Sequence, residues 1–128
     1  VALTAKRNDT FSLENLGWRL ENVVCIELLR RYHHQYAEIF YYKESSFEID
    51  FLVAKNGIVQ ELIQVSYNIT SPRNREREIN ALLRGAKKFN CRNLTLITFS
   101  TEQTVEKDNE TINLMPATKW LLGARKNG

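Results

Sequence analysis

The sequence predicts one α/β domain in which helices pack on a mixed β-sheet. Three observations indicate this class. Apolar residues recur at helical spacing in two segments, 12–32 and 72–90. Three strand patterns with short connections lie between those segments. A further apolar strand pattern follows the second helical segment, so the expected order of elements is α-β-β-β-α-β.

The size and composition of the chain fit an ordinary globular domain. Its 128 residues can form one hydrophobic core, and we expect a lead-in or linker over 1–11, the domain over 12–123 and a tail over 124–128. No apolar run reaches the ~20 residues that a membrane-spanning helix needs, so no membrane partner is expected. Cys25 and Cys91 lie in apolar stretches and are expected to be buried and reduced, which favours a cytoplasmic location.

The first helix is predicted to begin after Ser12, whose side chain suits an N-cap, and to end near Tyr32. Three strands should follow at 39–43, 46–54 and 58–67. Short connections between these strands predict an antiparallel meander. The apolar side of the helix falls on one arc at about 100° per residue and consists of Leu13, Leu16, Leu20, Val23, Val24 and Leu28.

The second half of the chain is predicted to add a crossover and a short ending. Ser71 and Pro72 suit the start of a second helix that runs to about Asn90. A buried strand within 92–100 follows, and a strand–helix–strand crossover makes its two strands parallel. We expect a polar loop over 101–111, a short strand at 112–115, and a helical turn from 116 to 122 that Gly123 ends.

Polar residues where the second and third strands lie side by side predict a metal-dependent site. Side chains alternate across a strand, so Gln64 and Ser66 share one face, near Asp50 on the preceding strand. Magnesium prefers hard oxygen ligands gathered at one end of a sheet. Asp50, the amide oxygen of Gln64 and the backbone carbonyl of Val65 are therefore candidate Mg²⁺ ligands.

A further carboxylate is expected from the first helix, which packs on the sheet. Glu21 lies at the edge of the apolar arc and Glu27 lies inside it. We expect Glu27 to pair with Arg30 or Arg31 rather than with a metal. Glu21 is therefore the candidate ligand from the helix.

These motifs, in this order, resemble the PD-(D/E)XK nuclease superfamily. They are Gly17-x-x-x-Glu21, Glu48-Ile-Asp50-Phe-Leu-Val and Ile63-Gln64-x-Ser66. More narrowly, three segments resemble the uncharacterised C-terminal domain of bacterial and archaeal AAA-type ATP-binding proteins. They are Leu20-Glu-Asn-x-Val with Glu27-Leu-Leu-Arg-Arg, Phe47-Glu-Ile-Asp-Phe-Leu-Val, and Met115-Pro-x-x-x-Trp-Leu-Leu122. The resemblance covers roughly 11–122 and implies a restriction-endonuclease-like αβββαβ core.

By position, the resemblance assigns Glu21, Asp50 and Gln64 to the catalytic and metal-binding set. Ser66 stands where the family has lysine. Serine cannot supply the charge that orients the attacking water, and loss of such a group costs on the order of 10²–10³ in rate. Enzymatic activity is therefore open, and weak or lost catalysis is favoured. Lys43 on the first strand is a candidate for a relocated lysine.

The second helix carries four basic residues within an arc of about 60°, namely Arg73, Arg77, Arg84 and Lys88. Cations that face away from the core can neutralise phosphates without reading a base sequence. These residues are therefore candidates for nucleic-acid binding, with DNA as the expected ligand. The alternative is a solvated helix face on which Glu76 and Glu78 partly balance the charge.

The leading interpretation is a nuclease-like accessory domain of an ATP-binding protein, which binds nucleic acid or a protein partner. The chain contains no Gly-x-x-x-x-Gly-Lys loop, so we expect the ATPase domain upstream in the same polypeptide. One alternative is an active Mg²⁺-dependent DNA endonuclease with a relocated lysine. Another is an oligomerisation or interaction domain that does not bind DNA, for which a homo-oligomer is expected.

Overall fold

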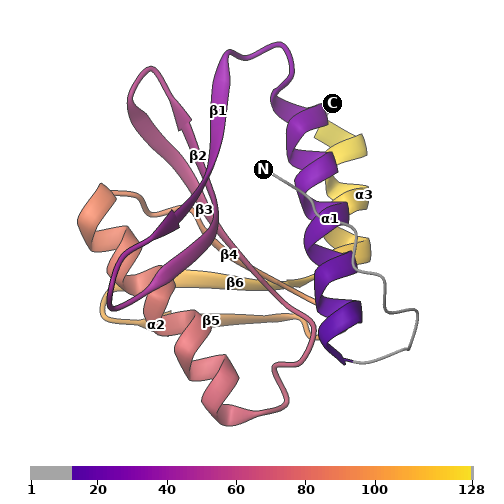
Figure 1. Ribbon diagram of the computed structural model, residues 1–128, viewed down its shortest axis with the longest axis vertical. Coiled ribbons are helices and arrows are strands. Elements are labelled where there is room, and N and C mark those ends of the chain that lie inside the picture. Colours follow the sequence, from indigo (N-terminus) through magenta and orange to yellow (C-terminus); the bar gives the residue numbers. More distant parts are fainter. Residues whose placement is uncertain (1–12, 128) are drawn as a thin grey trace.

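The structure, a computed structural model, describes the backbone of residues 13–127 and the side chains of residues 17–123. Six strands form one mixed sheet and three helices pack on it, which confirms the predicted α/β class. Figure 1 shows α2 (Pro72–Phe89) on one side of the sheet and α1 (Leu13–Tyr32) with α3 (Ala117–Asn127) on the other. The predicted lead-in and Ser12 lie outside the described residues.

Helix α1 contacts the sheet along a narrower line than the sequence predicted. Val24, Cys25 and Leu28 are almost fully buried against the sheet, together with Trp120 of α3. Val23 was predicted to belong to the apolar side, but its side chain is 42% exposed. Successive residues of a helix point about 100° apart. The orientation that buries Val24 and Leu28 therefore turns Val23 toward solvent.

Strands β1 (Ala37–Lys43), β2 (Glu48–Lys55) and β3 (Ile58–Ser66) form the predicted antiparallel meander. The register of β1 against β2 shifts by one residue between two of the residue pairs that they form. Phe40 pairs with Leu52, but Tyr42 pairs with Ile49. One residue of β1 therefore faces two residues of β2, which is a β-bulge.

Helix α2 forms the predicted crossover between β3 and β4 (Leu94–Thr98), and the two strands are parallel. Ser71 caps its first turn by accepting a hydrogen bond from the backbone of Asn74, and Asn90 ends it in the left-handed conformation. A Cβ atom at Gly85 would lie 2.8 Å from Leu62 Cδ1. This glycine therefore lets α2 approach the sheet closely.

The predicted loop over 101–111 is wrong, because β5 (Gln103–Lys107) and β6 (Glu110–Pro116) form a hairpin there. Asp108 and Asn109 make the turn with positive φ angles of 54° and 63°, which is typical of two-residue hairpin turns. Strand β5 lies at the edge of the sheet and only Val105 is partly buried. Its sequence therefore lacks the apolar alternation that predicts a strand.

Two smaller expectations concern α3 and the cysteines. Gly123 was predicted to end the last helix, but α3 continues to Asn127 and Gly123 does not adopt the positive φ of a helix end. Cys25 and Cys91 are both buried and free, as predicted. In the described part of the chain, no helix is long and apolar enough to cross a membrane.

Candidate functional site

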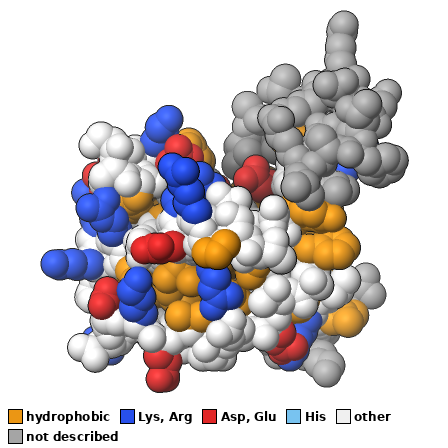
Figure 2. Space-filling model, turned by 90° about the horizontal axis from the view of Figure 1, so that it is seen from below, with side chains coloured by type: hydrophobic (Ala, Val, Ile, Leu, Met, Phe, Trp, Pro, Cys, Tyr) orange, Lys and Arg blue, Asp and Glu red, His pale blue; other side chains and the backbone are white. Residues whose placement is uncertain are grey.

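A pocket of about 810 Å³ opens where β2 begins and β3 ends, between the amino-terminal halves of α1 and α2. Figure 2 views the molecule from the lower end of Figure 1 and shows acidic and basic side chains close together on that face. The structure brings most of the predicted site residues together here. The pocket is lined by Glu21, Asp50, Gln64, Val65, Ser66, Arg77 and Arg84, among others.

Asp50 lies in the β-bulge of β2, where Asp50 and Phe51 face Tyr41 of β1. Bulges redirect side chains and are common beside functional sites. The regular pairing of β2 with β3 reaches only Phe51 and Ile63, so the two strands separate at Asp50. The carboxylate of Asp50 fills this gap and accepts a hydrogen bond of 2.9 Å from the backbone N–H of Val65.

Gln64 holds the two strands together at the same point. Its side chain is almost fully buried. The amide oxygen accepts a hydrogen bond of 2.7 Å from the N–H of Asp50, and the amide nitrogen donates one of 2.9 Å to the carbonyl of Glu48. Gln64 therefore replaces the backbone hydrogen bonds that the separated strands cannot make, and both ends of its amide are occupied.

Two carboxyl groups of the pocket, those of Asp50 and Glu78, have raised pKa values. Burial raises the pKa of Asp50 to about 8, and the negative charges of Glu21, Glu78 and Glu48 add to this effect against the hydrogen bond from Val65. Burial also raises the pKa of Glu78, with Glu21 and Glu48 contributing in the same direction. Shifts of this kind gather at functional sites.

Two of these carboxylates, Glu48 and Glu78, were not among the predicted site residues. Glu48 accepts a hydrogen bond of 2.7 Å from the hydroxyl of Tyr41, and this bond raises the pKa of Tyr41 to about 12. Glu78 was read only as a partner of the basic row on α2. The spacing of Glu48 and Asp50 along β2 could have indicated the former, but no sequence signal places Glu78 beside Asp50.

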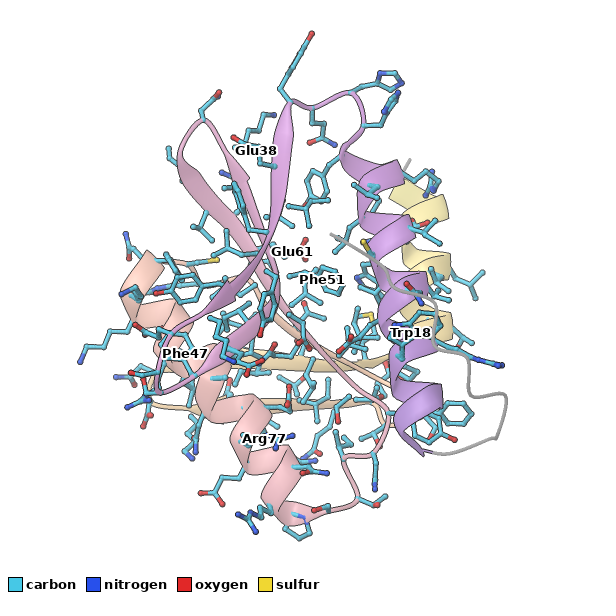
Figure 3. The ribbon with its side chains drawn as sticks, in the orientation of Figure 1. Trp18, Glu38, Phe47, Phe51, Glu61 and Arg77 are labelled. Atoms are coloured by element: carbon cyan, nitrogen blue, oxygen red, sulfur yellow. The ribbon has the colours of Figure 1, made fainter. Side chains whose placement is uncertain are left out.

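The basic residues at the pocket come from β1 and from α2. Lys43 lies 3.8 Å from Glu48 and Arg77 lies 3.6 Å from Glu78, measured between the charged atoms. The guanidinium of Arg84 donates a hydrogen bond of 3.3 Å to the carbonyl of Ser46. Figure 3 shows Arg77 on α2 and Trp18 on α1, on opposite sides of the lower part of the sheet.

The other two residues of the predicted basic row lie outside the lining of the pocket. Arg73 is exposed in the first turn of α2. Lys88 lies near the end of α2, 3.6 Å from Glu44 and above the ring of Tyr42. The row therefore runs along one edge of α2, and its middle residues face the pocket.

Glu27 makes the ion pairs that the sequence predicted. Its carboxylate accepts hydrogen bonds from Arg30 at 2.7 Å and from Arg31 at 3.0 Å. These bonds lower the pKa of Glu27, with that from Arg30 the larger cause. The remaining helix candidate, Glu21, lines the pocket.

Two of the predicted magnesium ligands, Asp50 and Gln64, accept hydrogen bonds from the backbone of the opposite strand. Asp50 and the Val65 backbone lie at the gap between the strands, but the Gln64 oxygen is bonded to the N–H of Asp50. Among the described residues, no three Asp, Glu, His or Cys side chains are placed to hold a metal ion. Ser66 adds no charge. The pocket can accept hydrogen bonds at its acidic floor and bind anions at its basic edge.

Fold and pocket together define an α/β domain with an acidic pocket bordered by a basic helix. A family model matches residues 16–120, and the chain belongs to that family, which is described as Domain of unknown function (DUF4143). The chain is also 38% identical over 115 residues to "Uncharacterized protein MJ1544" of Methanocaldococcus jannaschii. That alignment covers 85% of the chain and 25% of the relative, so the chain spans about a quarter of the relative's length.

Proposed function

We propose that this domain is a nuclease-like accessory domain that binds nucleic acid at its pocket and has lost metal-dependent cleavage. The αβββαβ order and the meeting of Glu21, Asp50 and Gln64 in one pocket support a restriction-endonuclease-like core. A nuclease of this class gathers its ligands at one end of the sheet. The bulge at Asp50 and the gap between β2 and β3 occur at that end.

The hydrogen bonds of Gln64 support the loss of cleavage. A metal ligand must offer an oxygen lone pair in a fixed geometry. The Gln64 amide instead joins Asp50 N–H to the Glu48 carbonyl, so turning its oxygen toward a metal would break two buried hydrogen bonds. Ser66 also leaves the lysine position without a charge, and such a group is worth on the order of 10²–10³ in rate.

The observation that carries the binding proposal is the position of Arg77 and Arg84. Both were predicted as nucleic-acid contacts from α2 alone, and both line the pocket that contains Asp50. A phosphate backbone that follows the exposed edge of α2 would therefore pass the pocket mouth. Such contacts give affinity without sequence specificity and depend strongly on salt.

The proposal also concerns the other domains of the polypeptide that contains this domain. The chain covers a quarter of its archaeal relative, so that protein has room for further domains. The resemblance to the C-terminal domain of AAA-type ATP-binding proteins suggests an ATPase domain upstream. In this arrangement, the domain holds nucleic acid for an ATPase in the same polypeptide.

The binding proposal is tested with a triple variant of Arg73, Arg77 and Arg84 to Ala. We expect the variant to lose most of its affinity for DNA at low salt. The slope of log Kd against log salt should flatten by about 0.7–0.9 for each phosphate contact that is lost. Equal binding by the triple variant and the wild type would refute the proposal. A control that replaces Lys87, Arg92 and Lys107 removes the same charge away from the pocket.

Cleavage is the second readout. We expect no cleavage of DNA with Mg²⁺ or Mn²⁺ that depends on Asp50. The Asp50→Ala variant, purified in parallel, identifies contaminating nucleases because their activity would persist in it. Cleavage by the wild type that disappears in Asp50→Ala would contradict the loss of catalysis.

The active-nuclease alternative has one observation in its favour. Lys43 lines the pocket and lies 3.8 Å from Glu48. If it replaces the missing lysine, Lys43→Ala should abolish metal-dependent cleavage as completely as Asp50→Ala does. The interaction-domain alternative is favoured by the exposed apolar side chains of Val23, Ile26 and Leu29 on α1. A stable oligomer without DNA affinity at low salt would decide for it.

A further inference from the structure

Two aromatic side chains meet just beyond the ends of β3 and β4. The two strands are parallel and their last paired residues are Ser66 and Thr98. The next residues along the chain, Tyr67 and Phe99, therefore leave the sheet side by side. Their ring centroids lie 4.9 Å apart with an interplanar angle of 55°. Ligands of α/β sheets commonly bind at this end of parallel strands.

Phe99 is presented to solvent rather than to the core. Its side chain is 60% exposed and belongs to neither hydrophobic cluster of the domain. The hydroxyl of Thr98 donates a hydrogen bond of 2.7 Å to the carbonyl of Thr101, which holds the turn that carries Phe99. A large aromatic side chain on a held turn exposes a ring face with little loss of entropy on binding.

Tyr67 joins this aromatic pair to the pocket. It lines the pocket beside Ser66, on the side of α1, where a Cβ at Gly17 would lie 3.9 Å from Tyr67 Cβ. Arg77 lines the same pocket from α2. Tyr67 and Arg77 therefore line one pocket, and the exposed ring of Phe99 lies against Tyr67 beside it.

The charges of the pocket attract the phosphate and the base of a nucleotide to different places. Its lining includes Glu48, Asp50 and Glu78, which repel a phosphate when they are ionised and accept hydrogen bonds from N–H donors. A nucleobase is neutral and carries such donors. Phosphates are therefore attracted to the arginine edge while a base can stack on the aromatic pair or enter the pocket.

We infer that the pocket mouth binds single-stranded nucleic acid, with bases stacked on Phe99 and Tyr67 and the backbone along Arg77 and Arg84. Base faces are accessible in a single strand, whereas a duplex keeps them stacked inside. This inference rests on the proposed nucleic-acid binding and specifies the form of nucleic acid that is bound. Base stacking on aromatics tolerates any sequence.

The test measures the affinity of the wild type and of Phe99→Ala for fluorescein-labelled oligothymidine, oligouridine and a DNA duplex of equal length. We expect the wild type to prefer the single strands. Phe99→Ala should bind them roughly tenfold more weakly, which is the loss typical of one stacked base. Its affinity for the duplex and its salt slope should not change, because no cation is removed. Tyr36→Ala is the matched control, since Tyr36 is 92% exposed but belongs neither to the pocket lining nor to the Tyr67–Phe99 pair.

Trp18 gives a second readout, because it lines the pocket whereas Trp120 is buried in the core. Unlabelled oligothymidine should quench tryptophan fluorescence in the wild type, and Trp18→Phe should abolish the quenching. Equal affinity for single strands and duplex, with no effect of Phe99→Ala, would overturn the inference and leave the proposed function standing. Failure of all three nucleic acids to bind at low salt would overturn both.

Discussion

Replacing Asp50 with Asn removes a carboxyl group that burial keeps protonated. The pKa of Asp50 rises to about 8 in the folded protein, mainly through burial, whereas its ordinary value is 3.8. The folded protein therefore binds this proton more tightly than the unfolded chain does. The contribution of Asp50 to the free energy of unfolding is then largest below pH ~4 and falls as the pH rises toward ~8.

Each pKa unit corresponds to about 1.4 kcal/mol, so the full shift amounts to about 6 kcal/mol between pH 4 and 8. Water in the open pocket screens part of this, and we expect about 2–3 kcal/mol to be measured. Asn carries no charge, and its amide oxygen can still accept the hydrogen bond from Val65 that Asp50 accepts at 2.9 Å. The Asp50→Asn variant should therefore be more stable than the wild type at pH 8 and similar to it at pH 4.

The assay is urea denaturation of both proteins at half-unit steps from pH 4 to 8.5. The difference in the free energy of unfolding should grow with pH across this window. Asp108→Asn serves as the control, because it is the same substitution at a position that is exposed in the turn between β5 and β6. Parallel stability curves for wild type and Asp50→Asn would refute the reasoning about burial.

Two further variants test the contacts that position the pocket. Gln64→Glu removes the donor to the Glu48 carbonyl and buries a carboxylate beside Asp50, so we expect a loss of about 2 kcal/mol in stability. An unchanged melting temperature would contradict the bridging role of Gln64. Gly85→Ala places a Cβ 2.8 Å from Leu62 Cδ1 and should cost about 1–3 kcal/mol. In the Gly17→Ala variant, the new Cβ on α1 makes only an ordinary contact, so this variant should be about 0.5–1 kcal/mol more stable than the wild type. Equal stability of the Gly85→Ala and Gly17→Ala variants would contradict the close packing of α2.

Most elements of the fold could be predicted because their signals are local. Ser71 and Pro72 mark the start of α2, and two apolar runs separated by the Asn56-Gly57 turn mark β2 and β3. Strand β5 was missed for a physical reason. It lies at the edge of the sheet, where exposed polar side chains are as compatible with a strand as with a loop. It therefore pairs with β6 without an apolar pattern in its sequence.

The residues of the candidate site also divide into those that the sequence could predict and those that it could not. Asp50, Gln64 and Ser66 could be named because they lie on two strands joined by a short turn, and a hairpin brings such residues together. Glu78 could not be named. It lies near Asp50 only because α2 packs closely over the sheet, and that approach depends on Gly85, where a Cβ atom would meet Leu62 and Ile49.

By itself, the sequence determined the α/β class, the parallel crossover and the two strands that carry the polar residues, since periodicity and turn chemistry act over a few neighbouring positions. Only the tertiary structure decided that the Gln64 amide bonds to the backbone of β2, that Asp50 shares one pocket with Glu21, Glu48 and Glu78, and that the rings of Tyr67 and Phe99 are in contact. These outcomes depend on distances between segments far apart in the chain, which the packing of helices on the sheet sets.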